Sequence, residues 1–176
     1  MKPYILIIIT SICSLLFSCS QNKEKVAYYS LDDTPSISDN SYQSGDEIEI
    51  PFREENGVKH IMVNVNGVGF EMIFDTGCSG ALISLAEANY LAEKGKLTQD
   101  DIIGTARSQI ADGSIVEDMV INLKEVIIGD KIRYNNVVAT VSSNINAPLL
   151  LGNEVLDRHA SVTIDNEHQV LLLKIN

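Results

Sequence analysis

The strongest candidate for a catalytic residue in this sequence is an aspartate at the end of a hydrophobic run. Asp75 follows an apolar stretch that ends at Phe74, and Thr76 and Gly77 come directly after it. Two such carboxylates within hydrogen-bond distance share one proton, because like charges so close do not both ionise. One can act as a base on a water molecule while the other protonates a carbonyl oxygen, as peptide hydrolysis requires. Gly77 permits a tight turn, and the Thr76 hydroxyl can hold that turn by hydrogen bonds.

The same three residues also have a plainer interpretation. An aspartate in a turn often accepts hydrogen bonds from the backbone just after it and has no catalytic role. A tripeptide of common residues also occurs by chance in chains of this length. The elements around Asp75 must therefore decide whether it is a turn residue or part of an active site.

The region around Asp75 reads mostly as short strands joined by tight turns. Asn66-Gly67 and Gly129-Asp130 are strong hairpin signals between alternating apolar and polar residues. Asp112-Gly113 is a third turn of the same kind. The predicted strands span 47–50, 61–65, 68–74, 107–111, 114–123, 124–128, 132–141, 161–164 and 169–175.

Helical spacing is confined to a few segments. Apolar residues recur at helical spacing from Ala81 to Lys94, and Gly95 is a suitable C-terminal cap. A second, short helix is expected to start at Thr98 in a capping box, and residues 153–159 can form one or two turns. Residues 149–152 form a buried apolar run closed by glycine. Mostly strands with one main helix predict an all-β fold built as a small closed barrel.

The longer run Met72–Gly80 resembles the active-site motif of retropepsin-like (clan AA) aspartic peptidases of bacteria. Asp75, Thr76, Gly77 and Ser79 keep the pattern of that family. Cys78 stands where the family usually has alanine, which is a conservative change in size, and Gly80 makes the loop less typical. The resemblance implies that Asp75 is the catalytic carboxylate and that residues 76–79 form the active-site loop.

Three further matches extend the resemblance to about Val58–Leu173. The Asn66-Gly67 hairpin precedes the motif strand, and residues Ala111, Asp112 and Gly113 lie where the family has its flap. Residues Leu150, Leu151 and Gly152, followed by Val155-Leu156, resemble the second family signature ahead of a C-terminal helix. The resemblance implies a retropepsin-like closed barrel of antiparallel strands. It also implies one main α-helix after the Asp-Thr-Gly loop, a short C-terminal helix, and no cofactor.

The chain contains a single Asp-Thr-Gly and no Asp-Ser-Gly. Pepsin-like enzymes carry two such motifs in one polypeptide, so the resemblance implies that a second chain supplies the partner of Asp75. The expected working unit is a symmetric homodimer acting on a peptide or protein substrate. By analogy with the terminal strands of the family, residues 46–52 and 171–176 are candidates for a sheet shared between the subunits.

The N-terminus reads as an export signal of a bacterial lipoprotein. One cation, Lys2, precedes an apolar stretch that is too short to span a bilayer comfortably. Residues 16–19 resemble a lipobox, which implies that Cys19 is acylated and tethers the protein to a membrane. We therefore expect a signal peptide at 1–18, a flexible tether at 19–45, a peptidase domain at 46–176, and a location in the bacterial cell envelope.

Composition and spacing exclude several other functions. A net charge of -11 argues against nucleic acid as a partner. The three histidines lack metal-ligand spacing, so no metal site is expected. Ser79 fails the Gly-x-Ser-x-Gly pattern because Ala81 follows Gly80.

Two alternatives to an aspartic peptidase stay open. In one, Cys78 is a thiol nucleophile with His60, His159 or His168 as its base. In the other, the protein is a lipoprotein without catalytic activity that uses the same groove to bind peptides or an envelope partner.

Overall fold

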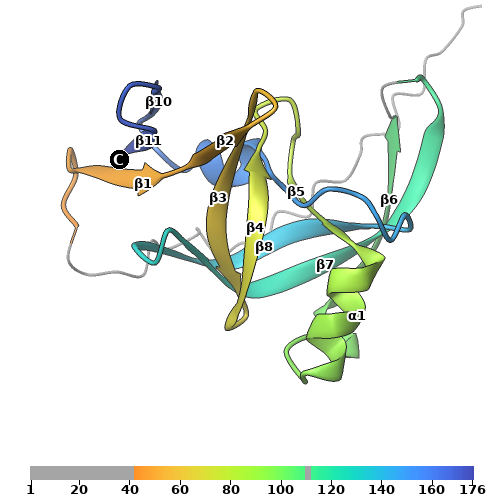
Figure 1. Ribbon diagram of the computed structural model, residues 1–176. Helices are drawn as coiled ribbons and strands as arrows, with labels where there is room; N and C mark the ends of the chain where they lie inside the picture. Colours follow the sequence, from red (N-terminus) through yellow and green to blue (C-terminus); the bar gives the residue numbers. More distant parts are fainter. Residues whose placement is uncertain (1–41, 110–111) are drawn as a thin grey trace, which may run out of the picture.

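The computed structural model describes residues 42–109 and 112–176, and most of the described chain forms strands (Figure 1). The predicted signal peptide, Cys19 and nearly all of the predicted tether lie outside the described residues, as does Ala111 of the predicted flap. The domain boundaries stay predictions. Within the described ranges, none of the helices has the length and apolar character that a membrane crossing requires.

The larger of two sheets has eight strands in the order β2-β3-β4-β9-β5-β8-β7-β6. An additional antiparallel pairing between β3 and β7 joins Val63 to Ile128 and Val65 to Val126, and this pairing closes the sheet into a barrel. The strands are β2 (Arg53–Glu55), β3 (Val58–Val65), β4 (Val68–Phe74), β5 (Ala81–Ser84), β6 (Ile102–Gln109), β7 (Ile115–Ile128), β8 (Ile132–Ser142) and β9 (Leu150–Leu151).

The predicted all-β closed barrel is therefore confirmed, with one refinement. Most pairings are antiparallel, but β4 pairs with β9 and β5 pairs with β8 in parallel. The hairpin turns at Asn66-Gly67 and Gly129-Asp130 are also confirmed, since all four residues have positive φ angles as this turn type requires.

The smaller sheet contains both ends of the folded region, in the order β1-β11-β10. β1 (Glu47–Pro51) and β10 (Ser161–Asp165) pair on either side of β11 (Val170–Lys174). The terminal segments that were candidates for a sheet between subunits thus pair with each other inside one chain. Ile50 and Leu171 explain this arrangement, because both are buried in the core of their own chain.

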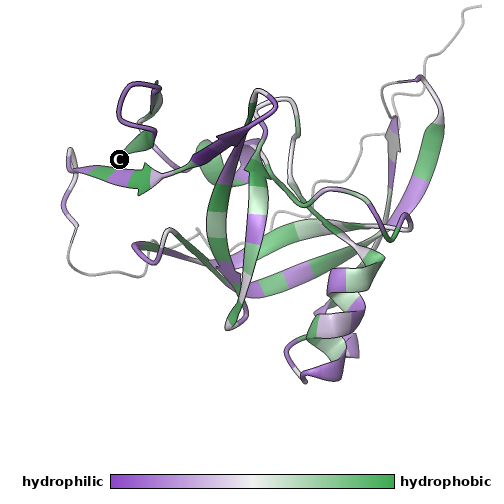
Figure 2. Cartoon of the chain, in the orientation of Figure 1, coloured by the Kyte–Doolittle hydropathy of each residue, from purple (hydrophilic) through white to green (hydrophobic). Residues whose placement is uncertain are grey.

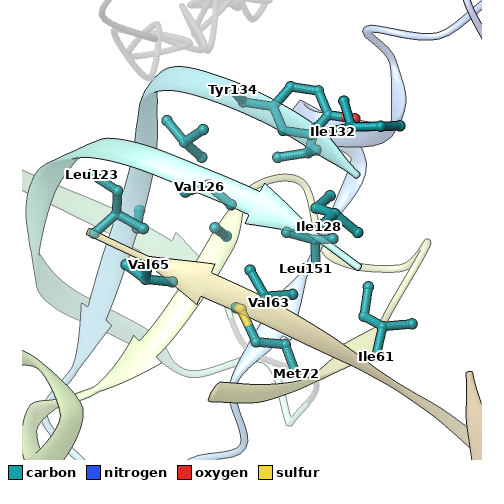
Figure 3. Packing of buried hydrophobic residues seen from close by; sticks show 14 of the residues in the cluster. Ile61, Val63, Val65, Met72, Leu123, Val126, Ile128, Ile132, Tyr134 and Leu151 are labelled. Atoms are coloured by element: carbon teal, nitrogen blue, oxygen red, sulfur yellow. The ribbon is translucent and has the colours of Figure 1, made fainter. Parts of the chain in front are cut away.

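The core lies inside the barrel and beneath the smaller sheet. Hydrophilic and hydrophobic residues alternate along the strands, as the bands of colour in Figure 2 show. Alternation of this kind gives each strand one buried face. Side chains from β3, β4, β7, β8 and β9 meet in the barrel interior (Figure 3), and Tyr134 is the largest of those that are fully buried.

The prediction of a helix over residues 81–94 was wrong for its first turn. Residues Ala81–Ser84 form β5, and α1 spans Leu85–Glu93. The first residues extend because they pair with both β8 and β9, and tertiary pairing overrides helix-compatible spacing. Ser84 then caps the helix by accepting a hydrogen bond from the Ala86 N–H at 3.0 Å. At the other end Gly95 has a φ of 67°, as predicted for a C-terminal cap.

Other strands and helices also begin or end at residues that differ from the predicted ones. β7 is one strand of 14 residues where two were predicted, and β6 begins at Ile102 rather than at Arg107. The short strand β2 was not predicted. The short helix after Thr98 is confirmed as η1 (Gln99–Asp101), and the Asp101 carboxylate accepts hydrogen bonds from the Thr98 N–H and hydroxyl. The predicted C-terminal helix is α2 (Asn153–Leu156), shorter than the predicted 153–159.

Candidate active site

Asp75 lies where β4 leaves the barrel, and β9 holds this point. Phe74 lies opposite Leu151 in the parallel β4–β9 pairing. The Asp75 N–H donates to the Leu151 carbonyl at 3.1 Å, which extends the pairing by one residue. The structure thus brings the Asp-Thr-Gly loop against the Leu150-Leu151-Gly152 segment, 75 residues later in the chain, counted from Asp75 to Leu150.

The loop itself is a tight turn. The Gly77 N–H donates to the Asp75 Oδ1 at 2.8 Å, and the Cys78 N–H donates to the Asp75 carbonyl at 3.2 Å. Asp75 is half-buried, whereas Thr76 and Gly77 are exposed. One oxygen of the carboxylate is thereby oriented by the loop backbone. This bond is also the turn hydrogen bond that an inert aspartate would make, so it does not by itself assign a catalytic role.

The N-terminus of α2 supports the loop from the other side. The Asn153 and Glu154 N–H groups donate to the carbonyls of Cys78 and Ser79, at 2.9 and 3.0 Å. The Asn153 side chain adds a bond from Nδ2 to the Thr76 carbonyl at 2.9 Å. Three donors from two consecutive residues thus hold three carbonyls of one loop. Sequence analysis did not single out Asn153, although an amide directly after Gly152 at a helix start is a recognisable signal.

Gly152 lies in direct contact with the loop backbone. A Cβ atom placed on Gly152 would lie 2.3 Å from the Gly80 carbonyl oxygen and 2.4 Å from the Cys78 carbonyl oxygen. Both atoms belong to the backbone and cannot swing aside as a long side chain can. Glycine is therefore required here by close approach, and not by its φ of -104°.

A cluster of buried polar side chains lies behind α2. Glu154 Oε1 accepts hydrogen bonds from the Val138 N–H and from Arg158 Nη2, each at 3.1 Å. Burial raises the pKa of Glu154 and lowers that of Arg158. The Arg158 guanidinium lies 5.5 Å from the centre of the Tyr134 ring. Glu154 and Arg158 are only four residues apart, a spacing that allows an ion pair on a helix, but their contacts with Val138 and Tyr134 arise only in the folded barrel.

Tyr134 and His159 complete this buried cluster. The Tyr134 hydroxyl and His159 Nε2 are 2.5 Å apart, and both side chains are buried. Burial raises the pKa of Tyr134 and lowers the pKa of His159. Both groups therefore stay uncharged near neutral pH.

The predicted flap is the hairpin between β6 and β7. The Asp112 Oδ1 accepts hydrogen bonds from the Ser114 N–H at 2.8 Å and the Ser114 hydroxyl at 2.7 Å, which lowers the Asp112 pKa. Gly113 has a φ of 87°. The hairpin extends away from the barrel in Figure 1, and Ile115 beside its tip is exposed.

A groove of about 490 Å³ opens beside the loop. One wall comes from Phe74, Thr76 and α2, and the other wall comes from Val162 and Ile164 of β10. Among the described residues β10 is an edge strand of the smaller sheet, with no strand of residues 42–109 or 112–176 paired on its outer side. The groove therefore joins the exposed part of the loop to a free sheet edge.

The profile of the gag-polyprotein putative aspartyl protease family matches residues 61–158, which include the Asp75 loop, the flap and α2. This match covers more than half of the chain. The chain belongs to this family.

A solved structure agrees with the family assignment. The protease is similar to a retropepsin-like aspartic protease from Rickettsia conorii, with 26% identity and a TM-score of 0.57 over 76% of this chain and 96% of that one. The protease of EIAV in complex with the inhibitor HBY-793 is more distant, with 14% identity and a TM-score of 0.41 over 60% of this chain and 90% of that one. No curated protein matches the sequence. The protein is an aspartic protease of the retropepsin kind by family and fold.

The contacts of Cys78 and of the histidines do not form a cysteine-enzyme site. Cys78 Sγ lies 3.2 Å from the Gly80 carbonyl oxygen. The histidines contact other groups: His60 lies near Glu71, His159 contacts Tyr134, and His168 contacts Asp165. Within the described residues, no group of three or more His, Cys, Asp or Glu side chains could hold a metal ion.

The Gly152 contact leads to a first prediction. We expect Gly152→Ala to destabilise the protease by about 2 kcal/mol or more, because the added methyl group displaces the backbone of the loop. Urea unfolding measures the loss. Gly69→Ala is a suitable control, because a Cβ there meets no atom within 4 Å. Equal stability of the two variants would contradict the contact.

Proposed function

We propose that the protein is an aspartic endopeptidase whose active site forms when the Asp75 carboxylates of two identical chains face each other. The supporting observation is the loop geometry. Asp75 follows the end of β4; its N–H donates to the Leu151 carbonyl and its carboxylate accepts the Gly77 N–H, while Thr76 and Gly77 are left exposed at the surface. The sequence has one Asp-Thr-Gly, so a single chain holds half of the expected pair.

The chemistry follows from a shared proton. In the pair, one carboxylate is ionised and the other is protonated, because two carboxylates in contact do not both carry charge. The ionised Asp75 takes a proton from water, and the oxygen of that water forms a bond to the carbonyl carbon of the substrate. The protonated Asp75 gives its proton to the carbonyl oxygen. Collapse of the resulting diol breaks the C–N bond: one carboxyl gives its proton to the leaving amine, and the ionised carboxylate takes a proton from a diol hydroxyl, which restores the singly protonated pair.

The proposed dimer surface is the groove beside the loop. Thr76 lies on one wall and must be close to the partner if the two Asp75 loops meet. The opposite wall is β10, whose free edge can pair with the same edge of a second copy around a two-fold axis. Ile164 on this wall is 42% exposed. A second copy would cover it and supply the missing carboxylate.

The N-terminal region supports a proposal about location. The apolar stretch before Cys19 and the polar residues after it are typical of a bacterial lipoprotein. We propose that lipid on Cys19 anchors the protease in the cell envelope, at the outer membrane or the cell surface. The substrate would then be a peptide or protein in that compartment.

We expect Asp75→Asn to abolish the peptidase activity. Purified protein lacking residues 1–19 should cleave a peptide library or a denatured protein at mildly acidic to neutral pH. Asp75→Asn should lower kcat by about 100- to 10,000-fold without unfolding the protein, since proton transfer is lost. Cys78→Ala is the matched control and should stay active. Cleavage that survives in Asp75→Asn would refute the aspartic mechanism, and an inactive wild type that binds peptides would favour a binding protein.

The groove predicts an effect of a charged substitution on the dimer. Ile164→Asp should weaken association at least about tenfold, because it places a charge where the partner would exclude water. Sedimentation at several concentrations measures the dissociation constant. Met62→Asp is the control, because Met62 is 57% exposed and does not line the groove. An unchanged dissociation constant in Ile164→Asp would move the interface elsewhere.

The lipid anchor is tested in cells. Full-length protein should separate with the membrane fraction, and Cys19→Ser should release it or leave it uncleaved, because serine has no thiol to accept the lipid. Metabolic labelling with a fatty acid identifies the modification directly. Equal labelling of both proteins would refute the assignment of Cys19.

A further inference from the structure

The Glu154 side chain joins the helix that holds the active-site loop to the wall of the barrel. The backbone N–H of Glu154 donates to the Ser79 carbonyl in the loop at 3.0 Å. Its carboxylate accepts the Val138 N–H of β8 at 3.1 Å through Oε1, while Oε2 would lie 3.8 Å from a Cβ placed on Gly80. The parallel β5–β8 pairing begins beside this point, with Ala81 opposite Ala139. One residue therefore contacts the end of the loop and the strand that receives the chain after the loop.

Arg158 fixes the direction of this carboxylate. Its Nη2 donates to Glu154 Oε1 at 3.1 Å, and its Nε donates to the Glu154 carbonyl at 3.2 Å. The guanidinium also packs over Tyr134, which is fully buried in the barrel. The side chains of Arg158 and Glu154 are 10% and 28% exposed. Water and salt therefore weaken the attraction between them less than they weaken an ion pair on the surface.

The helix needs such support because it is very short. α2 has four residues, and an isolated helix of this length does not form in water. Asn176 contributes a further bond, from its Nδ2 to the Arg158 carbonyl at 2.5 Å. These side chains, together with the buried Val155 and Leu156, hold the N–H groups that bind the Cys78 and Ser79 carbonyls. Besides the direct bond from Asp75 to β9, a second connection from the barrel to the loop thus runs through Glu154 and Arg158.

We propose that Glu154 and Arg158 are positioning residues of the protease, whose hydrogen bonds to each other and to β8 fix α2 and thereby the position and orientation of the Asp75 loop. The proposal rests on the proposed function only for its effect on catalysis, since its effect on the loop can be measured without a substrate. Neither side chain lines the groove, and neither makes a hydrogen bond to Asp75 within the described part of the chain. Displacement of a reacting group by about 1 Å can lower the rate about 100-fold.

The test compares Glu154→Ala and Glu154→Gln with wild type in kcat, KM, melting temperature and amide exchange of the loop. We expect Glu154→Ala to lower kcat by about 10- to 100-fold, with KM changed by less than about threefold. The amide protons of Asp75 and Cys78 should exchange at least about tenfold faster. Glu154→Gln should recover most of the kcat, because its amide oxygen still accepts the Val138 N–H.

Asp101→Asn is the matched control for loss of stability. Asp101 also has a buried carboxylate, which accepts a hydrogen bond from the backbone N–H of Thr98. It forms an ion pair with Lys124, whose Nζ lies 3.0 Å away. Its bonds are to Thr98 and Lys124 rather than to the Asp75 loop. Asp101→Asn should lower the melting temperature while kcat and loop exchange stay at the wild-type values.

Several outcomes would overturn the proposal. An unchanged loop exchange rate in folded Glu154→Ala would refute it, as would an equal fall of kcat in Asp101→Asn. If wild type lacks activity, the proposed function fails, and loop exchange alone decides the positioning role. If Glu154→Ala does not fold, Arg158→Lys replaces it, because lysine keeps the charge but lacks the second bond to Glu154. Arg158→Lys should then speed loop exchange at least about threefold, and wild-type exchange would refute the proposal.

Discussion

The contact between Gly152 and the backbone of the Asp75 loop is the constraint on which the rest of the site depends. With no side chain at this position, the carbonyls of Cys78 and Gly80 approach closely enough for the next two N–H groups to bind the loop. A loop otherwise exposes backbone groups that need partners. Here β9 and α2 supply those partners, and Asp75 acquires a defined position before any substrate or second chain is present.

The closed barrel is what makes this contact possible. The β3–β7 pairing closes the sheet. β9 pairs in parallel with β4, the strand before the loop, and β8 pairs in parallel with β5, the strand after it. Buried side chains from β3, β4, β7, β8 and β9, among other strands, fill the interior. Because such a core is closely packed and has low compressibility, it forms a rigid base for the loop at its end. The exposed face of the loop is left for a partner.

Sequence patterns predicted some parts of this arrangement better than others. The hairpin turns were predictable because positive φ angles favour Asn, Asp and Gly at known positions. The start of α1 was not, because Ala81–Ser84 have helix-compatible residues that the neighbouring strands hold extended. Glu154 and Arg158 were missed because their partners, Val138 and Tyr134, are about twenty residues away and meet them only in the folded barrel.

The sequence by itself determined the candidate catalytic residue and the local turns and strands around it. Asp75-Thr76-Gly77, the glycine turns and the Leu-Leu-Gly segment follow from residue type, backbone freedom and hydrophobic pattern, all of which are local properties. Only the tertiary structure decided which groups hold Asp75 and where the terminal strands pair. These outcomes depend on burial and on hydrogen bonds between residues that are distant in the chain. Within one chain β1 and β11 pair with each other, and this pairing buries Ile50 and Leu171 in the same core.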